Sequence, residues 1–250
     1  MEKKPYGTVL IKAAKLLDYI AENPNQTLQT ISTSINLTQS TALKILDTLV
    51  LIGYVKKNQG KTYSLGTRLI NYTSDEPHQA ALIELTQPYL AELQQTIDET
   101  IHLGIVENDE ILYIDKLEPK NQSIRMSSRI GITRPLYSSA MGKAALAEYS
   151  AEELTTYLAT HQLVAFTEKT ITKPLNLKNE LIQINQRKVA FDDEEMELEI
   201  FCFGASLVVA EKIVGTFSVS MPKYRLTPTL TAQIIQAIQT TKNKIEQKLM

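Results

Sequence analysis

The stretch "LTQSTALKILDTLVLIGYVKKNQGKTYSLG", residues 37–66, predicts a helix followed directly by a hairpin. Thr38 is a good N-cap for the helix, and Gly53 is placed to end it. The apolar residues between them share one helical stripe, which consists of Ala42, Ile45, Leu46 and Leu49. Residues 54–66 then have the composition of two strands joined by an Asn-Gln-Gly turn. The stretch therefore predicts a helix and a two-stranded wing.

Two further helices are predicted before this stretch. Residues 9–22 carry apolar side chains near helical spacing and run into Asn23-Pro24-Asn25, a sequence that ends helices. A second, shorter pattern is formed by Leu28, Ile31 and Ile35. Three helices followed by a hairpin are the arrangement of a winged helix-turn-helix.

Polar residues lie off the apolar stripe of the third helix, as a helix that enters the major groove of DNA requires. Short polar groups and one long cation can reach base edges and phosphates there, and wing lysines add salt-dependent phosphate affinity. The residues that we expect to contact DNA are Thr38, Gln39, Ser40, Thr41, Lys44 and Thr48 on the helix, and Lys56, Lys57 and Lys61 on the wing.

The distribution of charge favours the same interpretation. Residues 1–73 contain nine basic and four acidic residues, a net charge of +5. Because the whole chain carries −2, the remaining 177 residues carry −7. A basic head on an acidic body suits binding of a polyanion such as a double-stranded DNA operator by one end of the chain. Two other interpretations stay open: a solvated helical bundle, and a winged helix that docks on protein.

A polar junction containing Pro77 separates this head from the rest of the chain. The helical pattern that follows runs to Ile97 and is interrupted by Pro88, so we expect a kink there or a second helix beginning there. The predicted organisation is a winged helix-turn-helix over residues 1–73, a linker helix region over 74–98, and a second domain over 99–250.

The second domain alternates between strand and helix patterns. Residues 101–118 predict a hairpin and residues 123–126, "SIRM", a third strand. The later elements are helices near 139–148, 151–161 and 176–187, strands at 201–209 and 213–221, and a terminal helix after Pro228. This order is typical of an α+β domain built around an antiparallel sheet.

The sequence gives little support for an enzyme, a metal-binding protein or a membrane protein. The phosphate-loop pattern fails at two positions around "MGKAA", and the three histidines have no metal-ligand spacing. We therefore expect no catalytic residue, metal or cofactor, although an enzyme that uses Cys202 with His102 or the acidic segment stays an alternative. No apolar stretch of 18 residues exists, and a single cysteine suits a reducing compartment, so we expect a cytoplasmic protein without membrane contact.

Four motifs in order resemble the IclR family. They are "STALKILDTLVLIGYV" (40–55), "RIGITRPLYSSAMGKAALA" (129–147), "VAFDDEEMELEIFCFGASL" (189–207) and "TFSVSMP" (216–222). The resemblance implies a transcriptional regulator with an N-terminal winged helix and a C-terminal GAF-like effector-binding domain, active as a homodimer or tetramer. It further implies repression of a catabolic operon under the control of a small organic-acid or sugar-acid effector.

The same resemblance implies an effector pocket. Carried over by matching position, its residues are Met126, Arg134, Ala140, Met141, Asp192, Ile200, Cys202, Ser218 and Ser220. We expect an effector carboxylate to meet free N–H groups at the start of the helix near residue 139. The acidic run 192–199 is expected to be mostly solvated, with Asp192 alone facing the effector. Lys188 and Glu199 stand where the family favours glycine, so the local backbone is expected to differ at Glu199.

Overall fold

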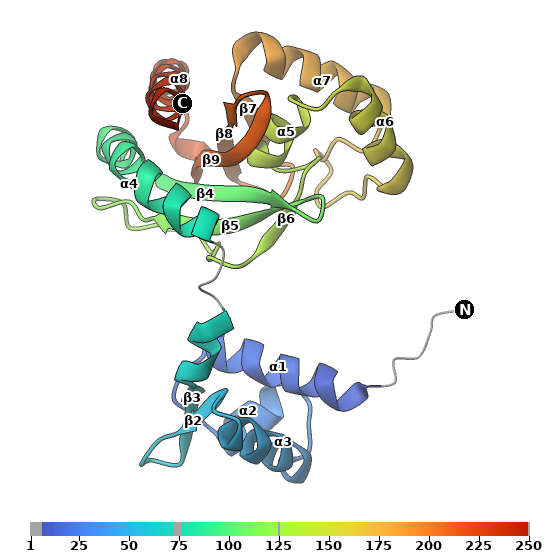
Figure 1. The fold of residues 1–250 in the computed structure, drawn as a ribbon, viewed down its shortest axis with the longest axis vertical. Helices are drawn as coiled ribbons and strands as arrows, with labels where there is room; N and C mark the ends of the chain where they lie inside the picture. Colours follow the sequence, from blue (N-terminus) through green and yellow to red (C-terminus); the bar gives the residue numbers. More distant parts are fainter. Residues whose placement is uncertain (1–6, 73–76, 125, 250) are drawn as a thin grey trace. The chain divides into compact units, whose positions relative to one another are not determined.

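The computed structural model of the chain describes residues 7–72, 77–124 and 126–249, which form two compact units. One unit is Met1–Pro77 and the other is His78–Met250 (Figure 1). Within the described residues, no helix combines the length and the apolar character needed to cross a bilayer.

The N-terminal unit is a winged helix-turn-helix. Its helices are α1 (Thr8–Glu22), α2 (Leu28–Ser34) and α3 (Gln39–Leu51), and its strands are β1 (Gln26–Thr27), β2 (Val55–Lys57) and β3 (Thr62–Leu65), followed by the 3-10 helix η1 (Thr67–Tyr72). The threonines before α2 and α3 cap these helices, since Thr27 Oγ1 accepts from Thr30 N and Thr38 Oγ1 from Thr41 N. The apolar stripes of the three helices meet in one core around Leu16, Ile31 and Leu46.

One strand of this unit was not predicted. β1 pairs with β3, so the sheet has three strands in the order β1-β3-β2. A strand of two residues is too short to leave an alternating pattern in the sequence. The predicted wing is formed by β2 and β3, with Lys57 opposite Tyr63.

The C-terminal unit is built on a six-stranded antiparallel sheet in the order β6-β5-β4-β9-β8-β7. The strands are β4 (Thr100–Glu107), β5 (Glu110–Leu117), β6 (Thr133–Pro135), β7 (Ala190–Asp193), β8 (Ile200–Val209) and β9 (Lys212–Pro222). The helices are α4 (Pro77–Ile97), α5 (Ala140–Leu146), α6 (Ala151–Thr160), α7 (Pro174–Arg187) and α8 (Pro228–Leu249), and η2 (Lys223–Arg225) is a short 3-10 helix.

Alternation along the strands gives the sheet two different faces. Phe217 and Val219 belong to an apolar core that also includes residues of α4 and α8. Ser218 and Ser220, which point the other way, line a cavity together with residues of α5. A second apolar cluster joins α5, α6 and α7 beside this cavity (Figure 1). The sheet therefore has one dry face and one face that is partly polar.

Two expectations about this unit are wrong or incomplete. Residues 123, 124 and 126 form no strand; instead Lys116 Nζ donates to the carbonyl oxygens of Met126 and Ser128, at 2.8 and 2.7 Å. The strand that pairs with β5 on the side away from β4 is β6, which begins ten residues after the start of the predicted strand. Strand β7, at the start of the acidic run, was missed because its four residues are partly acidic.

The junction helix α4 is a single helix that contains Pro88, so no second helix begins at this proline. Its residues Leu82, Leu90 and Leu93 belong to the apolar core of the C-terminal unit. The boundaries 1–73, 74–98 and 99–250 stay a prediction, but within the described residues the helix packs as part of the C-terminal unit.

Candidate functional site

The polar face of the large sheet forms the floor of a cavity of about 370 Å³. All nine residues expected to bind an effector line it: Met126, Arg134, Ala140, Met141, Asp192, Ile200, Cys202, Ser218 and Ser220. The cavity has nine further lining residues that the sequence did not indicate: His102, Tyr113, Ile124, Ser127, Ser128, Ser139, Phe166, Met196 and Glu197. That an effector binds here stays a prediction.

Strand register brings the floor residues together. Cys202 of β8 lies opposite Ser220 of β9, and Asp192 of β7 lies opposite Cys202. In the next row His102 of β4 lies opposite Ser218. Residues more than a hundred positions apart thus form one polar surface, because each strand turns every second side chain to the same face.

His102 links the floor to the loop that covers it. Its Nδ1 lies 3.3 Å from Ser218 Oγ and 3.4 Å from Ser220 Oγ, and its Nε2 lies 2.6 Å from Ser128 Oγ. Burial is the main cause that lowers the pKa of His102 to about 3, and the positive charges of Lys116 and Arg134 contribute to this shift. The imidazole is therefore neutral near pH 7, and together with Ser218 and Ser220 it gives the cavity floor uncharged hydrogen-bonding groups.

Helix α5 reaches this floor because two glycines allow a close approach. A Cβ on Gly204 of β8 would lie 2.4 Å from the carbonyl carbon of Ala140, and one on Gly142 would lie 2.4 Å from backbone atoms of Leu136. Since neither position can accommodate a side chain, Ala140 and Met141 sit directly against the sheet.

The start of α5 offers less to an anion than expected. The helix has only seven residues, and the Ser139 hydroxyl already accepts the N–H of Gly142 at 3.1 Å. Lys143 N donates to the carbonyl oxygen of Ser139. Two of the N–H groups at this helix start are therefore already bonded, and the contact of an effector carboxylate with those that precede them stays a prediction.

Arg134 supplies the positive charge of the cavity. Among the described residues that line it, Arg134 is the single Lys or Arg side chain. Burial raises the pKa of Tyr113, and a hydrogen bond from Arg134 opposes that rise, which places the guanidinium beside the phenol. A carboxylate that entered the cavity would meet a permanent positive charge at Arg134.

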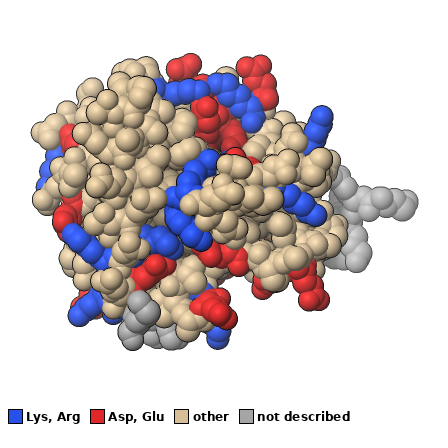
Figure 2. Space-filling model, turned by 90° about the horizontal axis from the view of Figure 1, so that it is seen from above, with Lys and Arg blue, Asp and Glu red and all other residues tan. Residues whose placement is uncertain are grey.

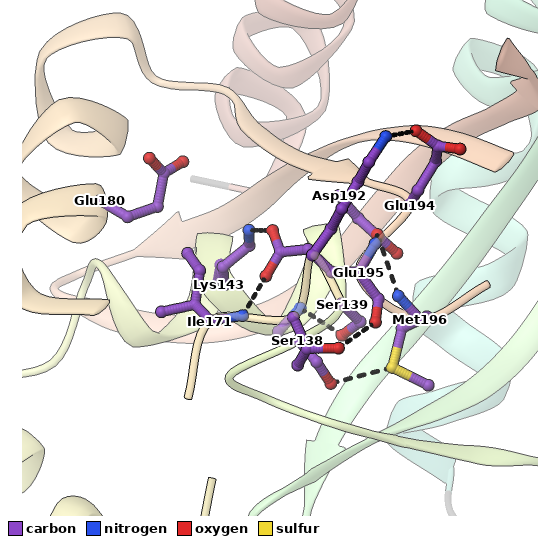
Figure 3. Close-up of polar contacts among 12 residues, drawn as sticks. Ser138, Ser139, Lys143, Ile171, Glu180, Asp192, Glu194, Glu195 and Met196 are labelled. Carbon is purple, nitrogen blue, oxygen red and sulfur yellow. Dashed lines mark hydrogen bonds and ion pairs between the residues drawn. The ribbon is translucent and has the colours of Figure 1, made fainter. Parts of the chain in front are cut away.

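The acidic run 192–199 is half buried: Asp192, Glu194 and Glu195 are buried and the other three carboxylates are exposed, so the expectation that it is mostly solvated is wrong for three of its six acids. Glu197 lines the cavity as well, so Asp192 is not alone in facing it. Asp192 Oδ1 accepts the N–H groups of Glu195 and Met196 at 2.8 and 3.3 Å, which turns the chain tightly after β7 (Figure 3). Burial raises the pKa of Asp192 to about 7, while the charge of Lys143 acts in the opposite direction. Asp192 is thus a buried carboxyl that both shapes this turn and lines the cavity.

Three lysines from separate segments hold the rest of this run. Lys143, which is 1% exposed, pairs with the buried Glu195 (Figure 3). Glu194 pairs with Lys169 and with Lys223. The two lysines hold the pKa of Glu194 at about 2. No cluster of three or more His, Cys, Asp or Glu in the described part of the chain is arranged to bind a metal ion, and these carboxylates serve as ion-pair partners.

The two residues at glycine-favoured positions adopt the left-handed conformation themselves. Lys188 has φ of 58° where it caps α7, and Glu199 has φ of 64° before β8. At Glu199 the carbonyl oxygen accepts from Lys223 N and the N–H donates to Glu194, so two hydrogen bonds hold the residue in this conformation; a local difference from the family's backbone stays a prediction. These bonds offset the cost of a positive φ.

The candidate DNA contacts lie in the N-terminal unit, on α3 and the wing. Gln39, Ser40, Lys44 and Thr48 are exposed on α3, Thr38 caps it and Thr41 is half-buried; Lys56 and Lys57 are exposed on β2, and Lys61 lies in the turn of the wing. Elsewhere the charges are mixed: the face in Figure 2 shows Lys and Arg interspersed with Asp and Glu. That these nine residues contact DNA stays a prediction.

Comparison with known proteins decides what this combination of units is. The family description "Bacterial transcriptional regulator IclR C-terminal" matches residues 77–247, and "IclR helix-turn-helix domain" matches residues 9–59. The chain belongs to the IclR family. IclR proteins of this kind are DNA-binding transcriptional regulators and not enzymes.

Individual relatives agree along the whole chain. An HTH-type transcriptional regulator of Haemophilus influenzae is 34% identical, with 99% of this chain and 95% of the relative covered. The acetate operon repressor of Salmonella typhimurium is 31% identical, with 87% of this chain and 81% of the relative covered. The crystal structure of the Thermotoga maritima IclR protein is 33% identical and superposes with a TM-score of 0.81, over 97% of this chain and 98% of that one.

Membership in the IclR family removes the enzyme alternative, and the site gives a physical reason. Burial raises the pKa of the Cys202 thiol, so the nucleophilic thiolate is disfavoured at neutral pH. Both nitrogens of His102 are engaged by serine hydroxyls. Cys202 therefore acts as a weakly polar part of the cavity wall.

Proposed function

We propose that this IclR regulator represses a catabolic operon and that a small organic acid, bound in the cavity, changes its affinity for operator DNA. The observation that carries the proposal is the meeting of one cation, Arg134, with the uncharged hydrogen-bonding groups of His102, Ser218 and Ser220 in a cavity large enough for a small molecule. Two acids, Asp192 and Glu197, also line this cavity. Repression is supported by the relationship to the acetate operon repressor.

The chemistry of the cavity favours an acid that also carries a hydroxyl or carbonyl group. A carboxylate would pair with Arg134, and a neutral polar group would bond to Ser218, Ser220 or His102 on the floor. An IclR homologue from Microbacterium hydrocarbonoxydans, 19% identical and with a TM-score of 0.75, was solved in complex with 4-hydroxybenzoate, which carries both kinds of group. A sugar acid combines the same two features.

The DNA-binding surface in this proposal is the exposed face of α3 with the lysines of the wing. Two copies in a homodimer or tetramer would present two such surfaces to an operator with two half-sites. An effector can change operator affinity only by binding more tightly to one arrangement of these surfaces than to another. The ion-paired segment 192–199 lines the cavity through Asp192 and Met196, so ligand contacts reach it directly.

DNA binding by α3 is tested by titrating the full chain against a promoter fragment over a range of salt concentrations. The logarithm of the affinity is expected to fall steeply with the logarithm of the salt concentration. Lys44→Ala is expected to weaken binding and to reduce the slope of this salt dependence by about one. Binding that does not depend on salt would contradict this part of the proposal.

Effector binding is tested by a thermal-shift screen of small organic and sugar acids, because a ligand that binds only the folded state raises its stability. Arg134→Met and Ser220→Ala are expected to abolish the shift that the wild-type chain shows, while operator binding without ligand is kept. Glu152→Gln serves as the control, since Glu152 is exposed on α6 and lines no part of the cavity. A shift that survives Arg134→Met would place the acid elsewhere.

A further inference from the structure

The hydroxyl groups of α3 are largely engaged within the helix. Thr38 Oγ1 accepts from Thr41 N at 3.3 Å and donates to Thr41 Oγ1 at 2.9 Å. Thr48 Oγ1 donates to the carbonyl oxygen of Lys44 at 2.9 Å. Three of the short polar residues thus form hydrogen bonds within the helix itself.

A large apolar side chain lies among these polar residues. Leu43 is 36% exposed, whereas its neighbours Ala42 and Ile45 on the same helix are buried. Gln39, Leu43 and Asp47 are spaced four apart and therefore form one stripe along the outer face of α3. The stripe therefore presents an apolar side chain between two polar ones on the outer face of α3.

The charges around Leu43 indicate what the stripe faces. Asp47 continues the stripe, and a carboxylate placed against phosphates would be repelled by them. Lys44 lies on the neighbouring stripe and can reach a phosphate while Gln39 and Leu43 point elsewhere. This arrangement suits a helix that turns Lys44 to the backbone of DNA and the stripe of Leu43 to base edges.

We propose that Leu43 reads the methyl group of a thymine in the operator half-site, next to a base read by Gln39. The inference rests on the proposed entry of α3 into the major groove. Thymine is the base that presents a methyl group there, and an apolar side chain contributes by covering it. Gln39 is suited to adenine, to which glutamine can bond through two atoms.

Helix geometry sets the spacing between the two bases. A separation of four residues along a helix is about 6 Å. Base pairs follow one another every ~3.4 Å along a DNA strand, so the thymine and the base contacted by Gln39 are expected within about two base pairs of each other. The half-site should therefore contain two A·T pairs at this spacing, one contacted by Leu43 and the other by Gln39.

The experiment begins with selection of a preferred operator from randomised duplex DNA by the full chain. Each thymine of the selected sequence is then replaced singly by deoxyuridine, which removes only the methyl group. Affinities are measured for the wild-type chain, for Leu43→Ala, and for Leu51→Ala. Leu51 is the matched control, since it is 85% exposed at the far end of the same helix, two turns from Leu43.

We expect one thymine per half-site at which deoxyuridine weakens wild-type binding about fourfold, the value for removing one buried methyl group. Leu43→Ala should bind thymine and deoxyuridine at that position equally well, and Leu51→Ala should discriminate like the wild-type chain. Leu43→Met keeps an apolar side chain and should keep the discrimination, which separates loss of the contact from loss of folding.

Two results would overturn the inference while leaving the proposed function intact. One is a selected operator at which no thymine is sensitive to deoxyuridine. The other is a Leu43→Ala variant that discriminates thymine from deoxyuridine as strongly as the wild-type chain. Failure of the wild-type chain to select any sequence would instead contradict the proposed function of α3.

Discussion

The exposed polar face of α3 and the buried polar floor of the cavity are both surfaces for recognition, yet they are stabilised in opposite ways. On α3, Gln39 and Lys44 are already in water, so replacing them costs the fold little. On the floor and in the adjoining segment 192–199, the buried polar groups, among them Ser218, Asp192 and Glu195, have lost their water and depend on protein partners. Changes on α3 should therefore affect DNA binding alone, and changes around the cavity should affect stability as well.

The largest effect is expected where a buried ion pair is broken. Lys143→Met leaves Glu195 buried without its cation, and the free energy of unfolding should fall by about 3–5 kcal/mol. Urea unfolding followed by circular dichroism measures it. The double variant Lys143→Met with Glu195→Gln removes both charges and should recover much of the loss. A double variant no more stable than the single one would show that packing, not charge, is responsible.

The next effect depends on pH and involves Asp192. Its pKa is raised from 3.8 to about 7 in the folded chain, chiefly by burial, so the folded state binds a proton more tightly than the unfolded state. This contribution to stability is complete below about pH 4 and is lost as the pH rises to about 7. Asp192→Asn cannot ionise and keeps the oxygen that accepts from Glu195 N, so above pH 7 it should be more stable than the wild-type chain, on the order of 2–4 kcal/mol.

The control for this prediction is Asp193→Asn. Asp193 is exposed and pairs at the surface with Lys223, so its replacement should change the free energy of unfolding by less than about 1 kcal/mol at any pH. The measurement is the melting temperature of the wild-type chain, of Asp192→Asn and of Asp193→Asn at pH values between 4 and 8. A difference between Asp192→Asn and the wild-type chain that stays constant with pH would contradict the assigned titration.

A smaller loss is expected where α5 touches the sheet. Gly204→Ala places a Cβ 2.4 Å from the Ala140 carbonyl carbon and should lower the free energy of unfolding by about 1–3 kcal/mol, since backbone cannot easily move aside. Gly60→Ala in the turn of the wing meets no atom within 4 Å and is the matched control. Equal stability of the two variants would mean that α5 does not lie against β8 as described.

The smallest effect is expected on α3. Thr48→Val removes a hydroxyl that is already bonded to the Lys44 carbonyl oxygen. Operator affinity should therefore change less than about twofold, whereas Lys44→Ala, with the loss of a charged contact of about 1–3 kcal/mol, should weaken it about fivefold or more. Fluorescence anisotropy with labelled operator measures both, and a large loss for Thr48→Val would show that its hydroxyl contacts DNA.

The parts of the molecule that could be predicted from the sequence are those fixed by neighbouring residues. Thr38 caps α3 because the cap and its N–H partner are three positions apart, and Ser218 and Ser220 share a face because strands alternate. The motif resemblance also selected nine residues that the fold brings to one cavity. His102 was considered only as a partner of Cys202, since nothing in its strand distinguishes a floor residue from a core residue.

The burial of the acidic run could not be predicted in this way. Lys143 and Glu195 are 52 positions apart, and Lys169 and Lys223 lie 25 and 29 positions from Glu194. A local reading of six carboxylates in eight residues predicts a solvated segment, because repulsion among them is evident and the compensating lysines are not. The strand predicted over residues 123–126 was wrong for the same reason, because Lys116 of β5 binds the backbone of this loop from a separate strand.

In the proposed function, an acid bound in the cavity changes the affinity of the exposed face of α3 for operator DNA. This effect is tested most directly by measuring operator affinity of the full chain in the presence of each acid that raises its melting temperature, with Arg134→Met measured in parallel. We predict that at least one such acid changes the operator affinity of the wild-type chain by fivefold or more, a coupling of about 1 kcal/mol, and leaves that of Arg134→Met unchanged. Acids that stabilise the wild-type chain through Arg134 but leave its operator affinity unaltered would contradict the claim.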